Sequence, residues 1–110
     1  MADIHNLPLV SIAMAVYNGE KYLYEQLNSI VNQTYKNIEV VICDDCSIDK
    51  SLDIIEQFSH QIDIKLFRNK NRLGVIKNFE KAISLCQGNH IALSDQDDIW
   101  EPDKIKKLVS

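Results

Sequence analysis

The sequence lacks a run of basic residues and any long run of apolar residues. Its 110 residues carry a formal net charge of −4, whereas nucleic acids and acidic membrane surfaces are bound by strongly positive faces. No apolar stretch approaches the roughly 20 residues of a membrane-spanning helix. The N-terminus also lacks the basic and apolar segments of a secretion signal. We therefore expect a cytoplasmic protein with no transmembrane segment in this chain and no nucleic acid partner.

Cysteine is scarce, because the chain has only Cys43, Cys46 and Cys86. An odd number of cysteines without a secretion signal favours reduced thiols over a disulfide framework. Cys43 and Cys46 form a C-x-x-C pattern after an apolar run, which leaves a redox module as one interpretation. The two aspartates between them disfavour the thiolate that disulfide exchange needs, and Cys43 completes an apolar run, as a core residue does.

Internal repeats, low-complexity tracts and linkers are absent as well. The length is that of one domain, and a hydrophobic content of 45% is enough to bury a core. We expect residues 1–8 to be an N-terminal tail and residues 9–110 to form one folded unit. The last expected helix barely begins before the chain stops, so we expect this unit to be part of a longer protein.

Four apolar segments alternate with four segments whose apolar residues recur every three or four positions. The first kind is typical of buried strands and the second of amphipathic helices. The expected strands are residues 9–16, 38–43, 62–67 and 90–93. The expected helices are residues 20–32, a segment capped by Ser47 or Asp49 that reaches Phe58, residues 74–87, and a segment that starts near Pro102.

Strict alternation of strands and helices predicts right-handed crossovers and a doubly wound, mostly parallel α/β sheet of the Rossmann-like type, in the order β-α-β-α-β-α-β-α. In the third helix, the predicted core-facing side holds Ile76, Phe79, Glu80 and Ile83. Gly88 is predicted to follow the last turn of this helix as its C′ residue, because glycine is favoured there.

The loops that follow the strands should share one edge of such a sheet. They contain residues 17–18, 44–45, 69–74 and 95–98. In an open parallel sheet, a ligand binds where the strand order reverses. If the first three strands run outward and the fourth returns beside the first, the binding crevice lies between residues 15–17 and 95–97.

The last of these loops carries Asp95, Asp97 and Asp98 within four residues, directly after an apolar run. Carboxylates this close repel one another unless a cation or several donors offset their charge. A divalent cation is the usual solution, and Mg²⁺ or Mn²⁺ takes oxygen ligands and leaves room for phosphate oxygens. The alternative is that these acids cap the following helix and are otherwise solvated.

Five segments in order resemble the nucleotide-binding half of family 2 glycosyltransferases. They are residues 10–18, 33–35, 44–49, 71–74 and 94–98. The resemblance implies a GT-A fold and transfer of a sugar from a nucleotide-diphosphate sugar. It covers residues 9–110, which would be the donor-binding part of a GT-A domain truncated at its C-terminus. The variant SDQDDIW at residues 94–100 is similar to the rhamnosyltransferase-like branch, which acts in polysaccharide or O-antigen assembly.

The resemblance also implies roles for individual residues. The segment of Ala15 and Tyr17 would line the nucleotide, and Asp45 would accept a hydrogen bond from the base of a UDP or dTDP donor. Asp95 would lie near the ribose. Asp97, the last acid of the DXD motif, would bind the Mn²⁺ or Mg²⁺ ion that stabilises the departing diphosphate.

Two further residues, Arg72 and Lys77, are weaker candidates for phosphate contact. In this family, a carboxylate that follows the nucleotide-binding half serves as general base toward the acceptor hydroxyl, so the residue is expected beyond Ser110. We therefore expect the chain alone to bind nucleotide without transferring sugar. The glycan or lipid-linked acceptor would bind the missing half, and the full-length protein would work in the cytoplasm, at the inner face of the membrane.

Two other classes stay open at this point. An acidic cluster at a strand end on a doubly wound sheet also describes Mg²⁺-dependent phosphotransfer domains, such as receivers and aspartyl phosphatases. These sites need a lysine and a hydroxyl residue from later strand ends, whereas Lys70 and Ser94 precede the acids here. The chain would instead be a non-catalytic interaction domain if it functions only when joined to another part.

Overall fold

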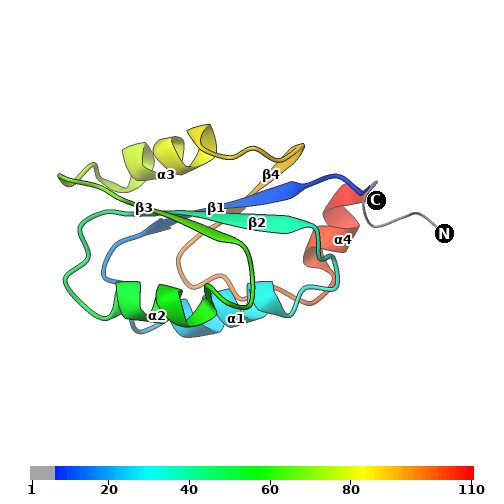
Figure 1. Ribbon diagram of the computed structural model, residues 1–110, viewed down its shortest axis with the longest axis horizontal. Coiled ribbons are helices and arrows are strands. Elements are labelled where there is room, and N and C mark those ends of the chain that lie inside the picture. The colour runs from blue at the N-terminus through cyan, green and yellow to red at the C-terminus, as the bar shows by residue number, and fades with distance from the viewer. Residues whose placement is uncertain (1–6) are drawn as a thin grey trace.

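The computed structural model describes residues 7–110, so residues 1–6 of the expected tail lie outside the described residues. Its elements follow the alternating order that the sequence predicts (Figure 1). They are β1 (Val10–Val16), α1 (Leu23–Val31), β2 (Ile38–Asp44), α2 (Ser51–Phe58), β3 (Ile64–Arg68), α3 (Val75–Ser84), β4 (His90–Ser94) and α4 (Lys104–Val109).

The four strands form one parallel sheet in the order β3-β2-β1-β4. The strand order therefore reverses between β1 and β4, as the proposed crevice requires, and that prediction is confirmed. Val16 at the end of β1 is opposite Asp44 of β2, and Met14 is opposite Ser94 of β4. The loops after these strands consequently leave the sheet at the same edge.

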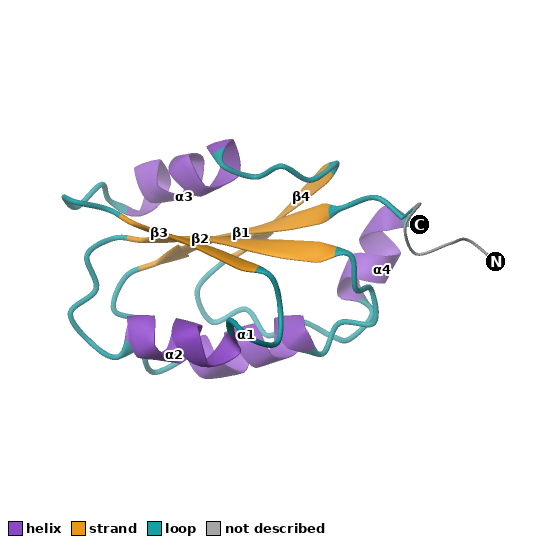
Figure 2. Ribbon diagram, in the orientation of Figure 1, coloured by secondary structure: helices purple, strands orange, loops and turns teal. Residues whose placement is uncertain are grey.

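Helices cover both faces of the sheet, which confirms the doubly wound arrangement (Figure 2). The helices α1 and α2 lie on one face, and the main hydrophobic core between them and the strands also takes in Trp100 and Ile105 from the C-terminal segment. On the other face α3 covers Ala13 of β1 and Cys43 of β2 in a smaller cluster. None of the helices between residues 7 and 110 is long and apolar enough to cross a bilayer.

The orientation of α3 differs from the prediction. Its buried residues are Asn78 and Ala82, whereas Ile76 is 75% exposed. Asn78 turns inward because its amide donates to the carbonyl oxygen of Cys43 (2.8 Å) and accepts from Asn69 (2.8 Å). Burial of this polar side chain is possible only with both bonds made. The helix is therefore rotated so that Ile76 leaves the sheet, while Ile83 of the predicted face still packs against Ala13, Cys43 and Ala82.

Gly88 does not end α3 as predicted, because the helix ends at Ser84 and Leu85 is the C-cap residue. Gly88 instead lies against β1, where a Cβ would come within 2.7 Å of the Leu9 carbonyl oxygen and of Ser11. The same region holds the fully buried Glu39, which accepts hydrogen bonds from Ser11 and Lys65 and from the backbone N–H of Gln87. Gly88 thus serves a close approach between the α3–β4 loop and the sheet.

Candidate functional site

A cavity of about 100 Å³ opens at the carboxyl edge of the sheet, where β1 and β4 diverge. Small-molecule sites typically enclose roughly 300–1,000 Å³, so this cavity is smaller than a site that surrounds a whole nucleotide. The cavity is lined by the ends of β1, β2 and β4, the start of α1 and the first turns of α3. The lining residues are Ala15, Val16, Tyr17, Tyr22, Asp45, Arg72, Val75, Asn78, Phe79, Asp95 and Gln96.

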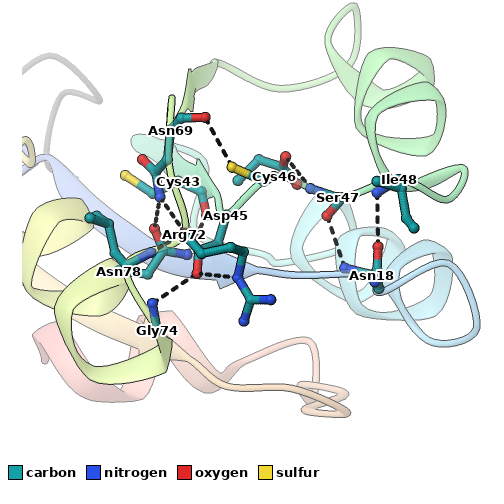
Figure 3. A network of polar contacts seen from close by, with 12 residues as sticks. Asn18, Cys43, Asp45, Cys46, Ser47, Ile48, Asn69, Arg72, Gly74 and Asn78 are labelled. Carbon is teal, nitrogen blue, oxygen red and sulfur yellow. Dashed lines mark hydrogen bonds and ion pairs between the residues drawn. The ribbon is translucent and has the colours of Figure 1, made fainter.

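Asp45 is buried at the floor of this cavity and organises the loop that follows β3. One carboxylate oxygen accepts from the Asn69 amide (2.9 Å) and the Leu73 backbone N–H (2.8 Å). The other accepts from the Gly74 backbone N–H (3.0 Å) and Arg72 Nε (3.1 Å). Figure 3 shows Arg72 and Gly74 converging on Asp45. A carboxylate offers about four acceptor positions, and protein donors occupy all of them here.

These bonds determine the charge state of Asp45. Burial by itself would raise its pKa, but the hydrogen bonds from Asn69, from the Leu73 and Gly74 backbone and from Arg72 outweigh burial and lower the pKa to about 2. Hydrogen bonds to the ionised form favour that form. Asp45 is therefore a carboxylate at neutral pH and a fixed negative charge beneath the cavity.

Arg72 and Tyr17 form the rim of the cavity. The Arg72 guanidinium carbon lies 3.5 Å from the centroid of the Tyr17 ring while its Nε contacts Asp45. Such stacking is a cation–π contact. About half of the Arg72 side chain remains exposed. Together the two side chains present a flat surface with unused N–H donors, which suits a planar or anionic ligand.

The β1–α1 and β2–α2 loops are tied together at the same edge. Asn18 donates its backbone N–H to Ser47 Oγ (2.8 Å) and accepts from the Ile48 N–H (2.9 Å), as Figure 3 shows. Asn18, Cys46 and Asp97 all have positive φ, a conformation that is uncommon for residues other than glycine. Unusual backbone of this kind concentrates at functional sites, where surrounding bonds maintain it.

The acidic loop forms a turn held by Asp98. The Asp98 carboxylate accepts from the Asp95 N–H (3.0 Å), and the Asp98 N–H donates to the Asp95 carbonyl oxygen (3.0 Å). Gln26 of α1 anchors the start of this turn through bonds to Ser94 Oγ (2.8 Å) and the Asp95 carbonyl oxygen (2.7 Å). Asp97 stays exposed. The acids thus differ in their surroundings, because the partly buried Asp98 closes the turn while Asp95 and Asp97 are exposed.

The carboxylates of Asp95 and Asp97 suit a divalent cation whose remaining ligands are phosphate oxygens. Within residues 7–110, no lysine or arginine pairs with Asp95 or Asp97, so their charge is not neutralised by the protein. No group of three or more metal-binding side chains is present in the same part of the chain. Mg²⁺ is commonly held by one or two carboxylates together with phosphate oxygens. Two solvent-facing carboxylates fit that pattern.

Five of the residues named from the sequence meet in one cavity, although they come from distant parts of the chain. They are Ala15, Tyr17, Asp45, Arg72 and Asp95. Asp97 lies beside the cavity without lining it, and Lys77 is an exposed residue of α3 outside it.

Sequence reasoning missed Tyr22, Val75, Asn78 and Phe79 as lining residues, whereas Gln96 lies in the segment 95–97 that it placed at the crevice. One signal was available, because Asn78 and Ala82 are spaced four apart on a helix, which places a polar and a small side chain on one face.

The cysteines carry no redox site in the described residues. Cys43, Cys46 and Cys86 are free, as the sequence predicts. Burial raises the pKa of Cys43, whose side chain is fully enclosed beside Ala13 and Ala82. The Cys46 thiol donates to the Asn69 carbonyl oxygen (3.3 Å). A buried thiol with a raised pKa is a poor nucleophile, so the C-x-x-C spacing reflects a core residue followed by a turn residue.

Two curated relatives cover nearly all of this chain. An uncharacterized glycosyltransferase of Haemophilus influenzae is 38% identical over 109 residues, which are 97% of this chain and 33% of the relative. The dTDP-rhamnosyl transferase RfbG of Shigella flexneri is 42% identical over 102 residues, which are 87% of this chain and 35% of the relative. The chain spans about a third of the length of these relatives.

A solved structure and a family model also match this chain. The crystal structure of S. aureus TarS 1-349 in complex with UDP matches 90% of this chain and 30% of that chain, with a TM-score of 0.86 and 30% identity. The family model for glycosyl transferase family 2 matches residues 11–110. That match covers nearly the whole chain and includes every segment lining the cavity. The chain therefore belongs to glycosyl transferase family 2.

Proposed function

We propose that this chain forms the donor site of a glycosyltransferase that moves a sugar from a nucleotide-diphosphate sugar to a glycan or lipid-linked acceptor in cell-surface polysaccharide or O-antigen synthesis. The observation that carries the proposal is the meeting of Ala15, Tyr17, Asp45, Arg72 and Asp95 in one cavity at the strand-order reversal. TarS with UDP and the dTDP-rhamnosyl transferase among the relatives support a UDP or dTDP donor.

The geometry supports a role for each side of the cavity. Ala15 and Tyr17 would border the nucleoside, and Arg72 would offer its unused N–H groups to ligand oxygens beside Tyr17. All four acceptor positions of Asp45 are taken. A base N–H would therefore reach Asp45 only if Arg72 yields its position. We leave Lys77 out of the proposed site because it lies outside the cavity.

Asp97, with Asp95 beside it, would hold Mn²⁺ or Mg²⁺ in this proposal. The fit rests on two exposed carboxylates that no cation of residues 7–110 neutralises. When bound, the cation would stabilise negative charge on the departing nucleoside diphosphate. The Asp98 carboxylate accepts the Asp95 backbone N–H, so we assign it to holding the turn and not to binding the metal.

No residue of this chain is proposed as the general base toward the acceptor. In the proposed function, that carboxylate and the acceptor site belong to a part of the protein that follows Ser110. Free thiols at all three cysteines suit a reducing, cytoplasmic setting. We propose that the acceptor is met there, at the inner face of the membrane.

The test is ligand-induced thermal stabilisation of the 110-residue chain. UDP, dTDP and GDP are each added with and without Mn²⁺, to wild type and to Asp97→Ala. A ligand at 100 times its Kd adds about 2.7 kcal/mol to the free energy of unfolding. We expect UDP or dTDP to raise the melting temperature only with Mn²⁺, and Asp97→Ala to abolish most of that rise.

Asp53→Ala is the matched control, because Asp53 is an exposed acid on α2 outside the cavity. It removes the same charge and should leave the nucleotide response unchanged. Absence of stabilisation by every nucleoside diphosphate in the presence of Mn²⁺ would contradict the proposed function. A response that survives in Asp97→Ala would instead contradict the metal assignment.

A further inference from the structure

Tyr22 occupies an unusual position at the start of α1. Its backbone N–H donates to the Gly19 carbonyl oxygen (3.1 Å), and its ring lies against Gly19. A Cβ built at position 19 would lie 2.8 Å from the Tyr22 hydroxyl oxygen and 2.9 Å from Cζ. The absence of a side chain at Gly19 therefore allows the phenol ring to lie where it does.

The Tyr22 side chain lines the same cavity as Tyr17, Arg72, Asp95 and Gln96. It comes from the β1–α1 loop, whereas Asp95 comes from the β4–α4 loop, so the two face each other across the reversal of strand order. Within residues 7–110 the hydroxyl makes no hydrogen bond to the protein. A half-buried hydroxyl at a cavity wall without a protein partner is available to a ligand.

The surroundings keep this hydroxyl protonated. Burial raises the pKa of Tyr22 above its ordinary value. The phenol is therefore a neutral O–H donor at physiological pH. Near Asp95 and Asp97 it is a donor that brings no positive charge and does not compete with a cation for their carboxylates.

We propose that the Tyr22 hydroxyl donates a hydrogen bond to the diphosphate of the donor nucleotide. The inference rests on the proposed function, because that function places a diphosphate at the cation held by Asp97. An anionic phosphate oxygen is a strong acceptor for a neutral hydroxyl, since charge-assisted bonds are about twice as strong as neutral ones. Gly19 is then a supporting residue whose missing Cβ leaves space for the ring.

The test compares a diphosphate ligand with one that lacks phosphate. Binding of UDP and of uridine, with Mn²⁺ present, is measured by calorimetry for wild type and Tyr22→Phe. A hydrogen bond to a charged group accounts for roughly a tenfold change in Kd or more. We expect Tyr22→Phe to weaken UDP binding about tenfold and to leave uridine binding unchanged. The same measurement with dTDP and thymidine covers the other base.

Two further variants sharpen the test. Tyr24→Phe is the control, because it removes the hydroxyl of a nearby tyrosine that is 53% exposed and packs on Phe58, outside the cavity. This variant should bind UDP as wild type does. Gly19→Ala keeps the Tyr22 hydroxyl but displaces it, and Gly19 has no positive φ that a side chain would strain. It should weaken UDP binding about as much as Tyr22→Phe, and the double variant should lose little more.

The outcomes separate this inference from the function on which it rests. Wild-type binding of UDP with an unchanged Kd in Tyr22→Phe would overturn the inference and leave the donor site standing. Equal weakening of UDP and uridine would also overturn it, because a hydroxyl that only supports the fold would affect both ligands. Failure of wild type to bind any nucleoside diphosphate would overturn the proposed function itself.

Discussion

Asp45 is the residue around which the cavity is built, because one carboxylate accepts four hydrogen bonds from the β3–α3 loop. Two of these donors are backbone N–H groups, of Leu73 and Gly74. The position of the β3–α3 loop therefore depends on where the end of β2 places the Asp45 carboxylate. The contact with Arg72 links the same carboxylate to the Tyr17 stack at the rim. A single side chain thus connects the sheet edge, the loop and the rim.

We expect Asp45→Asn to lower the free energy of unfolding at pH 7 by about 2 kcal/mol, because it loses the charge and replaces an acceptor with a donor. The pKa of Asp45 is lowered from 3.8 to about 2 by its hydrogen bonds. Its contribution is therefore complete above about pH 4 and is lost as the pH falls toward 2. Urea unfolding should show the two proteins converging in that range. A difference that stays constant from pH 7 to pH 2 would contradict this account.

The element that departs most from its sequence pattern is α3. Apolar spacing placed Ile76 and Ile83 toward the sheet, and Ile83 does pack against the cluster of Ala13, Cys43 and Ala82. Ile76 is exposed instead, and the helix buries Asn78 against the carbonyl oxygen of Cys43 and the amide of Asn69. This rotation brings Val75 and Phe79 to the cavity. The orientation of the helix is thus set by satisfied polar groups, and the site depends on that orientation.

We expect Asn78→Leu to destabilise the protein by about 2–3 kcal/mol, because it leaves the Cys43 carbonyl and the Asn69 amide without their partner. Ile76→Ser should change stability by less than about 0.5 kcal/mol, since Ile76 is exposed. The measurement is the denaturant midpoint of unfolding of wild type and of both variants. The reverse ranking, with Ile76→Ser the more damaging, would restore the orientation that the apolar spacing predicted.

On the scale of the whole molecule, β4 is an edge strand with an open apolar face. Ile91 and Leu93 are exposed on it, and Ile76 and Val75 of α3 continue the apolar surface. Edge strands with exposed apolar side chains favour association with other chains.

We expect the 110-residue chain to self-associate through this edge, and Ile91→Lys to reduce the association by placing a charge on the strand. Static light scattering over a concentration series measures the effect. His60→Lys, at an exposed site after α2, adds the same charge away from the edge and should leave the association unchanged. If both variants reduced self-association equally, net charge and not the β4 edge would account for the effect.

The sequence alone determined the alternating elements, the parallel doubly wound sheet and the edge at which functional residues gather. Periodicity reports burial, and short alternating elements leave few topologies open. Motif resemblance named Ala15, Tyr17, Asp45, Arg72 and Asp95, which the fold brings into one cavity. These features depend on local patterns, so they are readable before folding.

Only the tertiary structure decided which polar groups satisfy one another. The four bonds to Asp45, the anchoring of the acidic loop by Gln26 and the burial of Asn78 join segments from different loops and helices. Tyr22 became a candidate because its ring rests on Gly19 and faces the cavity. Hydrogen bonds depend on distance and direction in space, and neither is encoded in the spacing of residues along a chain.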